Sequence, residues 1–217
     1  MGEKFDIHLR EIQVIRPDGE LLFSIPDLQV PFGSHLLVQG PSGRGKTTFL
    51  HLLAGLFRPA KGSVLIGGVD LNARSDGELC DFRKSKIGVI FQKLNLIDHM
   101  TVSENISLAL PRLSADESED LRQRVLKDVN LEGASEKRCS YLSVGEQQRV
   151  AVARVLAQRP EIVLADEPTS SLDEKNGEFV LEALKRVSQG KTLIVVSHDQ
   201  RLLKKFDRVI SFEDFCQ

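Results

Sequence analysis

The 217-residue sequence contains no tryptophan, one tyrosine and three cysteines. The cysteines, Cys80, Cys139 and Cys216, form no CxxC pair and have no histidine at a metal-ligand spacing. This pattern indicates free thiols in a reducing compartment rather than a disulfide framework or a metal centre. A bilayer span needs about 20 consecutive apolar residues, and the apolar runs of this chain are much shorter. Residues 1–10 are charged and alternating, unlike a signal peptide, so we expect any membrane role to come through a partner.

The chain also lacks an excess of charge of either sign. Its 29 lysines and arginines nearly balance 31 aspartates and glutamates, which leaves a formal net charge of −2. A protein that binds nucleic acid through a basic surface carries a clear positive excess, so we expect no nucleic-acid partner. Hydrophobic residues make up 41% of the chain, an ordinary proportion for a globular core. The length suits one α/β domain, and we expect residues 1–217 to form a single domain.

The first part of the chain has the pattern of short strands followed by a helix. Alternating apolar residues predict strands within 5–39, with a turn at 17–19. The apolar run 35–39 ends at Gly40, which is typical of a buried strand that leads into a loop. Further along, the patterns predict a helix over 47–56 and two more strands, over 62–71 and 86–91.

The middle of the chain is predicted to be mostly helical, from residue 102 to about residue 158. Pro111 and Gly133 break this stretch. Ser114 is expected to cap the helix between them, because acidic residues follow it at once and basic residues come later, as the helix dipole favours.

Two strongly apolar strands are predicted over 162–165 and 192–196, with a helix over about 176–188 between them. Apolar strands that alternate with helices predict a parallel sheet covered on both faces. The helical block, about 93–157, is then an insertion between the strand near Ile87 and the strand that begins at Ile162.

A glycine-rich phosphate-binding pattern follows the strand at 35–39. Its eight residues match GxxxxGK[ST] in full, between a predicted strand and a predicted helix. Glycines allow backbone N–H groups to converge on phosphate oxygens, and the helix N-terminus adds positive dipole. The alternative, an ordinary glycine-rich turn, fits this context poorly. We expect phosphate contacts from Gly40, Pro41, Ser42, Gly43, Arg44, Gly45, Lys46, Thr47 and Thr48.

Several polar residues with suitable chemistry lie at the ends of strands. Lys46 is expected to contact the β- and γ-phosphates and Thr47 to bind Mg²⁺. Asp166 closes a buried strand and is expected to hold Mg²⁺ or its water, while Glu167 polarises the attacking water as the general base. The alternative reading of these two carboxylates is an acidic pair that solvates a loop.

Two further polar residues, His198 and Gln92, also follow predicted strands. His198 follows the last apolar strand; it is either a surface residue or a donor to the γ-phosphate. Gln92 ends the strand near 86–91, where its amide oxygen could reach Mg²⁺ or the water.

These motifs occur together in one known family. The chain resembles an ATP-binding-cassette ATPase over nearly its whole length. The segment 142–149, LSVGEQQR, is similar to the LSGGQ signature of that family, and 165–173, ADEPTSSLD, is similar to its Walker B motif and D-loop. The resemblance implies a P-loop NTPase with a mixed RecA-like sheet core, an N-terminal antiparallel β subdomain and an inserted α-helical subdomain. It also implies catalytic roles for Lys46, Glu167 and His198 and a Mg²⁺ or water contact for Gln92.

In this family the signature of one protomer meets the phosphate loop of the other. The resemblance therefore implies a homodimer in which Ser143, Gly145 and Glu146 contact the ATP held by Lys46 of the partner protomer. The signature should open a helix, whose N-terminus would add dipole and N–H groups at the γ-phosphate.

Three departures from the family pattern alter these expectations. Val144 replaces the middle glycine, and a β-branched residue resists positive φ, which predicts a hindered approach of the backbone to phosphate. Glu146 replaces glutamine, a mild change that adds negative charge near the phosphates. The family stacks adenine on an aromatic residue after the first strand, and 12–16 contains none. Arg16 is the first candidate for this contact and Phe23 a weaker one.

The resemblance also implies a membrane partner. In the family, the segment after the glutamine receives a helix of the membrane subunit, and the apolar residues between Leu94 and Met100 suit such docking. Burial of these residues in the helical block is an equal alternative. We expect an ATP-hydrolysing subunit on the cytoplasmic face of the inner membrane, in the group serving lipoprotein release, macrolide efflux and cell division. The other interpretation is a regulatory, cell-division-type ATPase that drives cell-wall remodelling rather than transport.

Overall fold

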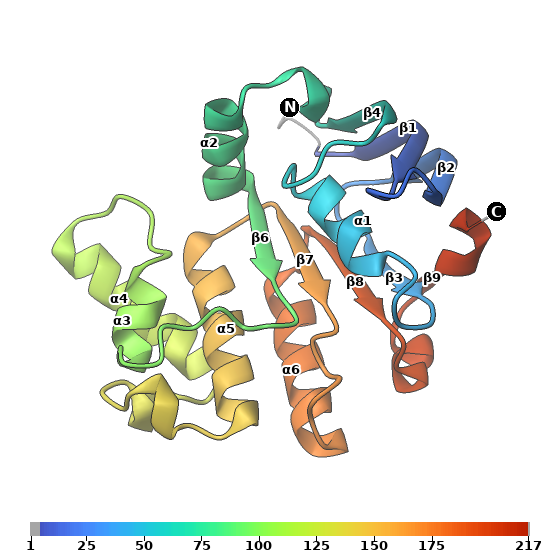
Figure 1. Ribbon diagram of the computed structural model, residues 1–217. Helices are drawn as coiled ribbons and strands as arrows, with labels where there is room; N and C mark the ends of the chain where they lie inside the picture. The colour runs from blue at the N-terminus through green and yellow to red at the C-terminus, as the bar shows by residue number, and fades with distance from the viewer. Residues whose placement is uncertain (1–4, 217) are drawn as a thin grey trace.

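The computed structural model describes residues 5–216 and contains two sheets flanked by helices (Figure 1). The first sheet is antiparallel, in the order β2-β1-β4-β5. Its apolar side chains, among them Ile7, Leu9 and Val14, are buried because the strands alternate between a covered and an exposed face. The strands predicted within 5–39 and 62–71 are confirmed. Their bounds are β1 (Ile7–Ile15), β2 (Leu21–Val30), β4 (Lys61–Ile66) and β5 (Val69–Asp70).

The second sheet is the core of the molecule, and its five strands pair in parallel in the order β6-β7-β8-β3-β9. Every residue of β7 and β8 is buried, since helices cover one face and α1 with the first sheet covers the other. The predicted parallel sheet is thus confirmed. Its strands are β3 (His35–Gln39), β6 (Ile87–Ile90), β7 (Ile162–Asp166), β8 (Thr192–Ser197) and β9 (Arg208–Ser211).

The helices follow the predicted order with one addition. The helix after the phosphate loop, the helical stretch in the middle and the helix between the last two predicted strands are all present. The addition is α2, which is strongly charged and buries only Leu79, so it carries little of the apolar periodicity that predicts a helix. The α-helices are α1 (Lys46–Leu53), α2 (Asp76–Lys86), α3 (Val102–Ser107), α4 (Ala115–Asp128), α5 (Val144–Gln158) and α6 (Glu174–Val187).

Helices α3, α4 and α5 form a block beside the core sheet, and α5 packs against both α3 and α6 (Figure 1). Ser114 caps α4 as predicted, and its hydroxyl accepts a hydrogen bond from the N–H of Glu117. Glu117 in turn accepts from the N–H of Ser114, which completes a capping box. The start of this block is therefore fixed by local sequence. Between residues 5 and 216, no helix has both the length and the apolar character needed to cross a membrane.

Candidate functional site

A cleft of about 300 Å³ opens where β3, β7 and the start of α1 meet. This is the edge at which ligands bind in parallel α/β sheets, because the carboxyl ends of the strands converge there. The structure brings together residues that lie more than a hundred positions apart in sequence. The cleft is lined by Leu22, Ser42, Gly43, Gly45, Lys46, Thr47, Thr48, Gln92, Asp166 and Glu167.

The glycine-rich loop has the conformation that phosphate binding requires. Gly43 and Gly45 have φ values of +78° and +108°, in the left-handed region that favours glycine. A Cβ on Gly45 would lie 3.1 Å from the Phe23 ring and 3.2 Å from Leu22, so a side chain there would crowd the first sheet. Gly45 caps α1, whose first residue is Lys46. The loop therefore directs the N-terminal dipole of α1 into the cleft.

The Lys46 ammonium is folded back onto its own loop. Its Nζ donates to the carbonyl oxygens of Gly40 and Pro41, at 2.8 and 2.9 Å, and lies 3.5 Å from Oε1 of Glu167. The Lys46 side chain is only 5% exposed. A phosphate entering the cleft would offer the ammonium negatively charged acceptors in place of the two neutral carbonyl oxygens.

Asp166 has one oxygen engaged and one free. Its Oδ2 accepts a hydrogen bond of 2.7 Å from the Thr47 hydroxyl, while Oδ1 is buried and has no partner among residues 5–216. Burial raises the pKa of this carboxyl above its ordinary value, against the hydrogen bond from Thr47, which lowers it. A buried, unpaired carboxylate oxygen beside a hydroxyl suits a hard cation such as Mg²⁺. Mg²⁺ usually binds through one or two carboxylates, so the lack of a larger acidic cluster in 5–216 is consistent with that fit.

Glu167 is held from several sides. Its backbone has φ +48°, which is uncommon for a residue other than glycine. Its carboxylate accepts from the Ser197 hydroxyl at 2.7 Å and lies 2.7 Å from Nδ1 of His198. The His198 side chain is about half exposed at the rim, whereas the Glu167 carboxylate is almost fully buried. Of the three expected catalytic residues, Lys46 and His198 thus both contact Glu167.

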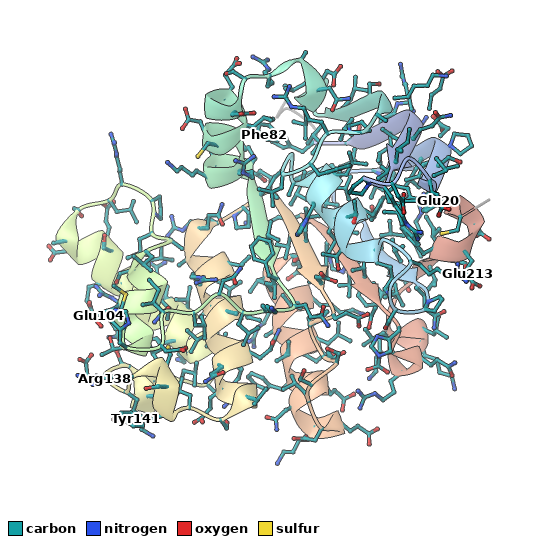
Figure 2. The ribbon with its side chains drawn as sticks, viewed as in Figure 1. Glu20, Phe82, Glu104, Arg138, Tyr141 and Glu213 are labelled. Carbon is teal, nitrogen blue, oxygen red and sulfur yellow. The ribbon has the colours of Figure 1, made fainter. Side chains whose placement is uncertain are left out.

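The signature segment lies outside the cleft. Ser143 caps α5, in a capping box with Glu146, so the segment opens a helix as predicted. Figure 2 shows Tyr141, two residues before Ser143, near Arg138 at the outer end of the helical block. Tyr141 and Ser143 are exposed, and no signature residue lines the cleft of the same chain.

The ground for expecting Val144 to hinder the approach of the backbone to phosphate was a positive φ, and the structure does not show one at this residue. Val144 is the first residue of α5 and does not have a positive φ, so its β-branched side chain is compatible with the helical backbone. The side chain is 54% exposed and points away from the core. The tight position is Gly145, where a Cβ would lie 3.3 Å from the side-chain amide of Asn176 at the start of α6.

The adenine candidates differ in what the structure allows. Phe23 is fully buried and packs edge-on against Phe212, with ring centroids 5.3 Å apart, so it cannot stack on a base. Arg16 lies in the turn after β1 and does not line the cleft; its Nη1 is 3.5 Å from Glu20. Leu22 does line the cleft and was missed, since nothing in its sequence context separates it from other strand residues. An aliphatic contact is thus available beside the phosphate loop.

The segment from Leu94 to Met100 is bound to the helical block through its backbone. Arg154 of α5 donates to the carbonyl oxygens of Leu94 and Asn95, at 2.9 and 2.8 Å. Asn105, fully buried, accepts a hydrogen bond of 2.9 Å from the N–H of Ile97. Leu96 packs against the core of the block. Leu96 is thus partly buried, as the burial alternative expects.

A larger groove, of about 660 Å³, lies next to this segment between the core sheet and the helical block. Arg154 joins the two features, because it lines the groove and also binds the Leu94 carbonyl. Leu56 and Leu108, which are 47% and 57% exposed, contribute apolar surface. The groove is completed mainly by Ile87, Val89, Phe91, Ala109, Leu110, Pro111, Val155 and Gln158, with Arg83, Lys84 and Arg112 at its polar side.

Comparison with known proteins identifies the family. The family model described as ABC transporter matches residues 24–170. An uncharacterized ABC transporter ATP-binding protein of Methanocaldococcus jannaschii, MJ0796, is 38% identical over 205 residues, which cover 90% of this chain and 87% of that protein. The lipoprotein-releasing system ATP-binding protein LolD of Buchnera aphidicola is 40% identical over 182 residues, which cover 82% and 80% of the two chains.

The fold comparison gives the same result. A dimeric structure of MJ0796, described as a post-hydrolysis state bound to ADP and phosphate, superposes with a TM-score of 0.87 at 36% identity. The match covers 94% of this chain and 93% of the other. The predicted P-loop NTPase fold, with its antiparallel subdomain and inserted helices, is confirmed. The chain belongs to the ABC transporter family, in which it is an ATP-binding subunit with ATPase activity.

Proposed function

We propose that residues 1–217 form a single nucleotide-binding domain that works as a homodimer and clamps two ATP molecules between its protomers. The observation that carries this proposal is the separation of the two halves of the site within one chain. Lys46, Thr47, Asp166 and Glu167 line the cleft, whereas Ser143 is exposed outside it. A signature with no access to its own cleft is suited to the cleft of a second copy. The dimeric structures of the related MJ0796 support this arrangement.

In the proposed clamp, the phosphate loop holds the triphosphate of ATP. Backbone N–H groups of 42–48 and the α1 dipole bind phosphate oxygens. Lys46 leaves the carbonyl oxygens of Gly40 and Pro41 for the β- and γ-phosphates. Leu22 offers an apolar surface near the loop, and Arg16 stays the candidate for stacking on adenine after release from Glu20.

Thr47 and Asp166 would hold Mg²⁺, with Gln92 as a further ligand or water contact. The buried, unpartnered Oδ1 of Asp166 supports this assignment. Bound there, Mg²⁺ would supply positive charge that offsets the charge of the phosphates. The residues of this chain bind and orient the ATP.

Hydrolysis requires a base next to the attacking water, and Glu167 is the residue proposed for it. Its carboxylate lines the cleft, 3.5 Å from the ammonium of Lys46, the residue proposed to bind the β- and γ-phosphates. His198 is proposed to turn from Glu167 to the γ-phosphate when ATP binds, which its half-exposed position permits. Ser143, Gly145 and Glu146 of the partner protomer would close the site over the γ-phosphate.

The motion of the clamp is proposed to drive an integral membrane subunit that docks in the groove beside the segment Leu94–Met100. The groove presents exposed apolar side chains at Leu56 and Leu108. Arg154 connects its wall to that segment and to the signature helix. Peripheral attachment at the cytoplasmic face of the inner membrane follows from this partner. The similarity to LolD supports the lipoprotein-release group.

The test uses the variant Glu167→Gln. Glutamine keeps an acceptor oxygen for Ser197 but cannot take a proton from water, so ATP should be bound and not hydrolysed. We expect a stable dimer with ATP and Mg²⁺ in size-exclusion chromatography with light scattering. The double variant with Lys46→Ala is the control and should stay monomeric. A Glu167→Gln protein that stays monomeric at saturating ATP would refute the two-site clamp.

A further inference from the structure

We propose that Ser197 is a positioning residue for hydrolysis, whose buried hydroxyl keeps the Glu167 carboxylate in place when His198 and Lys46 turn to the phosphates of ATP. This role rests on the proposed function of Glu167 as the general base.

The Glu167 carboxylate has two kinds of partner. Lys46 and the His198 ring approach Oε1, at 3.5 and 2.7 Å. The Ser197 hydroxyl donates to Oε2 at 2.7 Å, and the N–H of His198 donates to both oxygens at 3.1 and 3.3 Å. Lys46 and the His198 ring are charged or titratable groups that are also proposed to bind the phosphates of ATP. The second kind are neutral donors fixed to β8.

ATP binding would remove the first kind of partner. The Lys46 ammonium would bind phosphate oxygens, and the His198 side chain is half exposed and free to turn. Ser197 is 0% exposed, so its hydroxyl cannot reach a ligand in the cleft. Among side-chain donors to Glu167 in residues 5–216, Ser197 is therefore the one that would persist in the ATP-bound site.

Ser197 is itself held firmly. Its Oγ accepts a hydrogen bond of 3.1 Å from the N–H of Asp199, which leaves its proton directed at Glu167. Its carbonyl oxygen accepts from the N–H of Gly40, at 3.2 Å, at the start of the phosphate loop. Ser197 thus links the phosphate loop, through its carbonyl oxygen, to the catalytic carboxylate, through its hydroxyl.

A second contact closes this linkage into a ring. The Thr169 hydroxyl, two residues after Glu167, donates to Oδ2 of Asp199 at 3.3 Å. The backbone from Glu167 to Thr169 is in this way fastened at both ends to the segment Ser197–Asp199. Glu167 needs such support because its φ of +48° is unfavourable for a residue with a side chain.

The test compares replacements of Ser197 that differ in hydrogen bonding. Ser197→Cys keeps nearly the same volume with a weak donor, and Ser197→Thr keeps the hydroxyl. Ser188→Ala is the matched control, since Ser188 is also fully buried but its hydroxyl has no partner within residues 5–216. The measurements are kcat and KM for ATP, the melting temperature, and hydrogen–deuterium exchange of the peptide 166–172 without nucleotide.

We expect Ser197→Cys to lower kcat about tenfold or more, because a small displacement of a catalytic group is costly, with KM changed less than about twofold. Ser197→Thr should recover most of the rate. Exchange over 166–172 should be faster in Ser197→Cys and unchanged in Ser188→Ala. Wild-type kcat in Ser197→Cys would overturn the proposal, as would a well-folded Ser197→Thr that is as slow as the cysteine variant.

Glu167→Gln, measured alongside, distinguishes a failure of the proposed base Glu167 from a failure of the proposed role of Ser197. A wild-type rate of hydrolysis by Glu167→Gln would refute the role of Glu167 as the general base. It would also remove the proposed role of Ser197, which depends on it. An inactive Glu167→Gln beside a fully active Ser197→Cys would refute the role of Ser197 alone.

Discussion

The Ser143 hydroxyl donates a hydrogen bond of 2.8 Å to Oε2 of Glu146, so the second residue of the signature is bound to its fifth. The Ser143 N–H donates to the same oxygen at 2.8 Å. These two hydrogen bonds, the backbone one first, lower the pKa of Glu146, with smaller contributions from the charges of Arg149 and Lys137. Glu146 is therefore ionised at neutral pH. In the proposed dimer, Glu146 therefore competes with the γ-phosphate of the partner's ATP as acceptor for the Ser143 hydroxyl.

Replacing Glu146 by glutamine should strengthen ATP-driven dimerisation. The glutamine oxygen can still accept from Ser143 and complete the capping box, but the negative charge near the γ-phosphate is gone. An exposed pair of charges interacts by about 0.2–1 kcal/mol, and the dimer loses two such repulsions, one in each site, so we expect roughly two- to thirtyfold tighter dimerisation of the Glu167→Gln background at low salt. Sedimentation with ATP measures this, and the gain should shrink at high salt.

Glu117→Gln is the matched control for that change. Glu117 forms the same capping box with Ser114 at the start of α4, outside the signature. It should leave dimerisation unchanged. Weaker dimerisation of Glu146→Gln would instead assign the carboxylate a favourable contact in the closed dimer.

Val144→Gly restores the family's glycine and should change hydrolysis little. Val144 already has a helical backbone and an exposed side chain, so glycine offers no better approach to phosphate. We expect a hydrolysis rate equal to or above that of the wild type, and a slightly lower melting temperature because glycine weakens a helix. Val144→Ala should match in rate without the loss of stability. An inactive glycine variant would show that the valine side chain contacts ATP or the partner protomer.

Asp166→Asn distinguishes the effect of Asp166 on the stability of the metal-free protein from its effect on the affinity for Mg²⁺. Asparagine can still accept from Thr47 but places no uncompensated charge in the buried site, and such a charge is costly. In EDTA we expect a melting temperature equal to or above that of the wild type. With ATP and Mg²⁺ the wild type should gain clearly more stability than the variant. Equal gains in the two proteins would argue against Asp166 as a metal ligand.

Glu78 should make stability depend on acidic pH. The Ser75 N–H, then hydrogen bonds from Arg74 and the Ser75 hydroxyl, lower the pKa of Glu78 from 4.5 to about 2. Because the folded-state pKa is depressed, the stabilising effect is present above pH 4.5 and is lost as pH falls towards 2. Glu78→Gln cannot titrate, so the difference in melting temperature between wild type and variant should narrow below pH 4.5. A difference that stays constant from pH 7 to pH 3 would contradict this.

The parts of the fold that could be predicted are those with local signals. The glycines around Lys46 predict the phosphate loop. Ser114, followed by acidic residues, predicts the start of α4. Helix α2 was missed because Leu79 is its one buried residue, which leaves little apolar periodicity to detect. Local rules succeed where a few consecutive residues determine the conformation.

The parts of the site that could not be predicted depend on distant packing. Phe23 cannot stack on adenine because it packs against Phe212, which lies almost two hundred residues later in the chain. The contact between Ser197 and Glu167 depends on the register of β7 with β8, which pairs Asp166 with Val196. Strand register between separate segments leaves no mark in either segment alone, so the hydroxyl beside the carboxylate could be found only in three dimensions.

Leu108→Glu tests whether the groove is the docking site of the membrane subunit. Leu108 is exposed in the groove and lies outside the cleft, so a charge there should leave hydrolysis by the isolated subunit within about twofold, the range expected for a surface change away from the site. It should abolish co-purification of a multi-span membrane protein from gently solubilised membranes, because burying an unpaired carboxylate against an apolar helix is costly. Leu203→Glu, at an exposed leucine outside the groove, is the control and should retain the partner. If Leu108→Glu also retains it in stoichiometric amount, the membrane subunit docks on another surface, and the polar link from Arg154 to Leu94 would then serve the helical block alone.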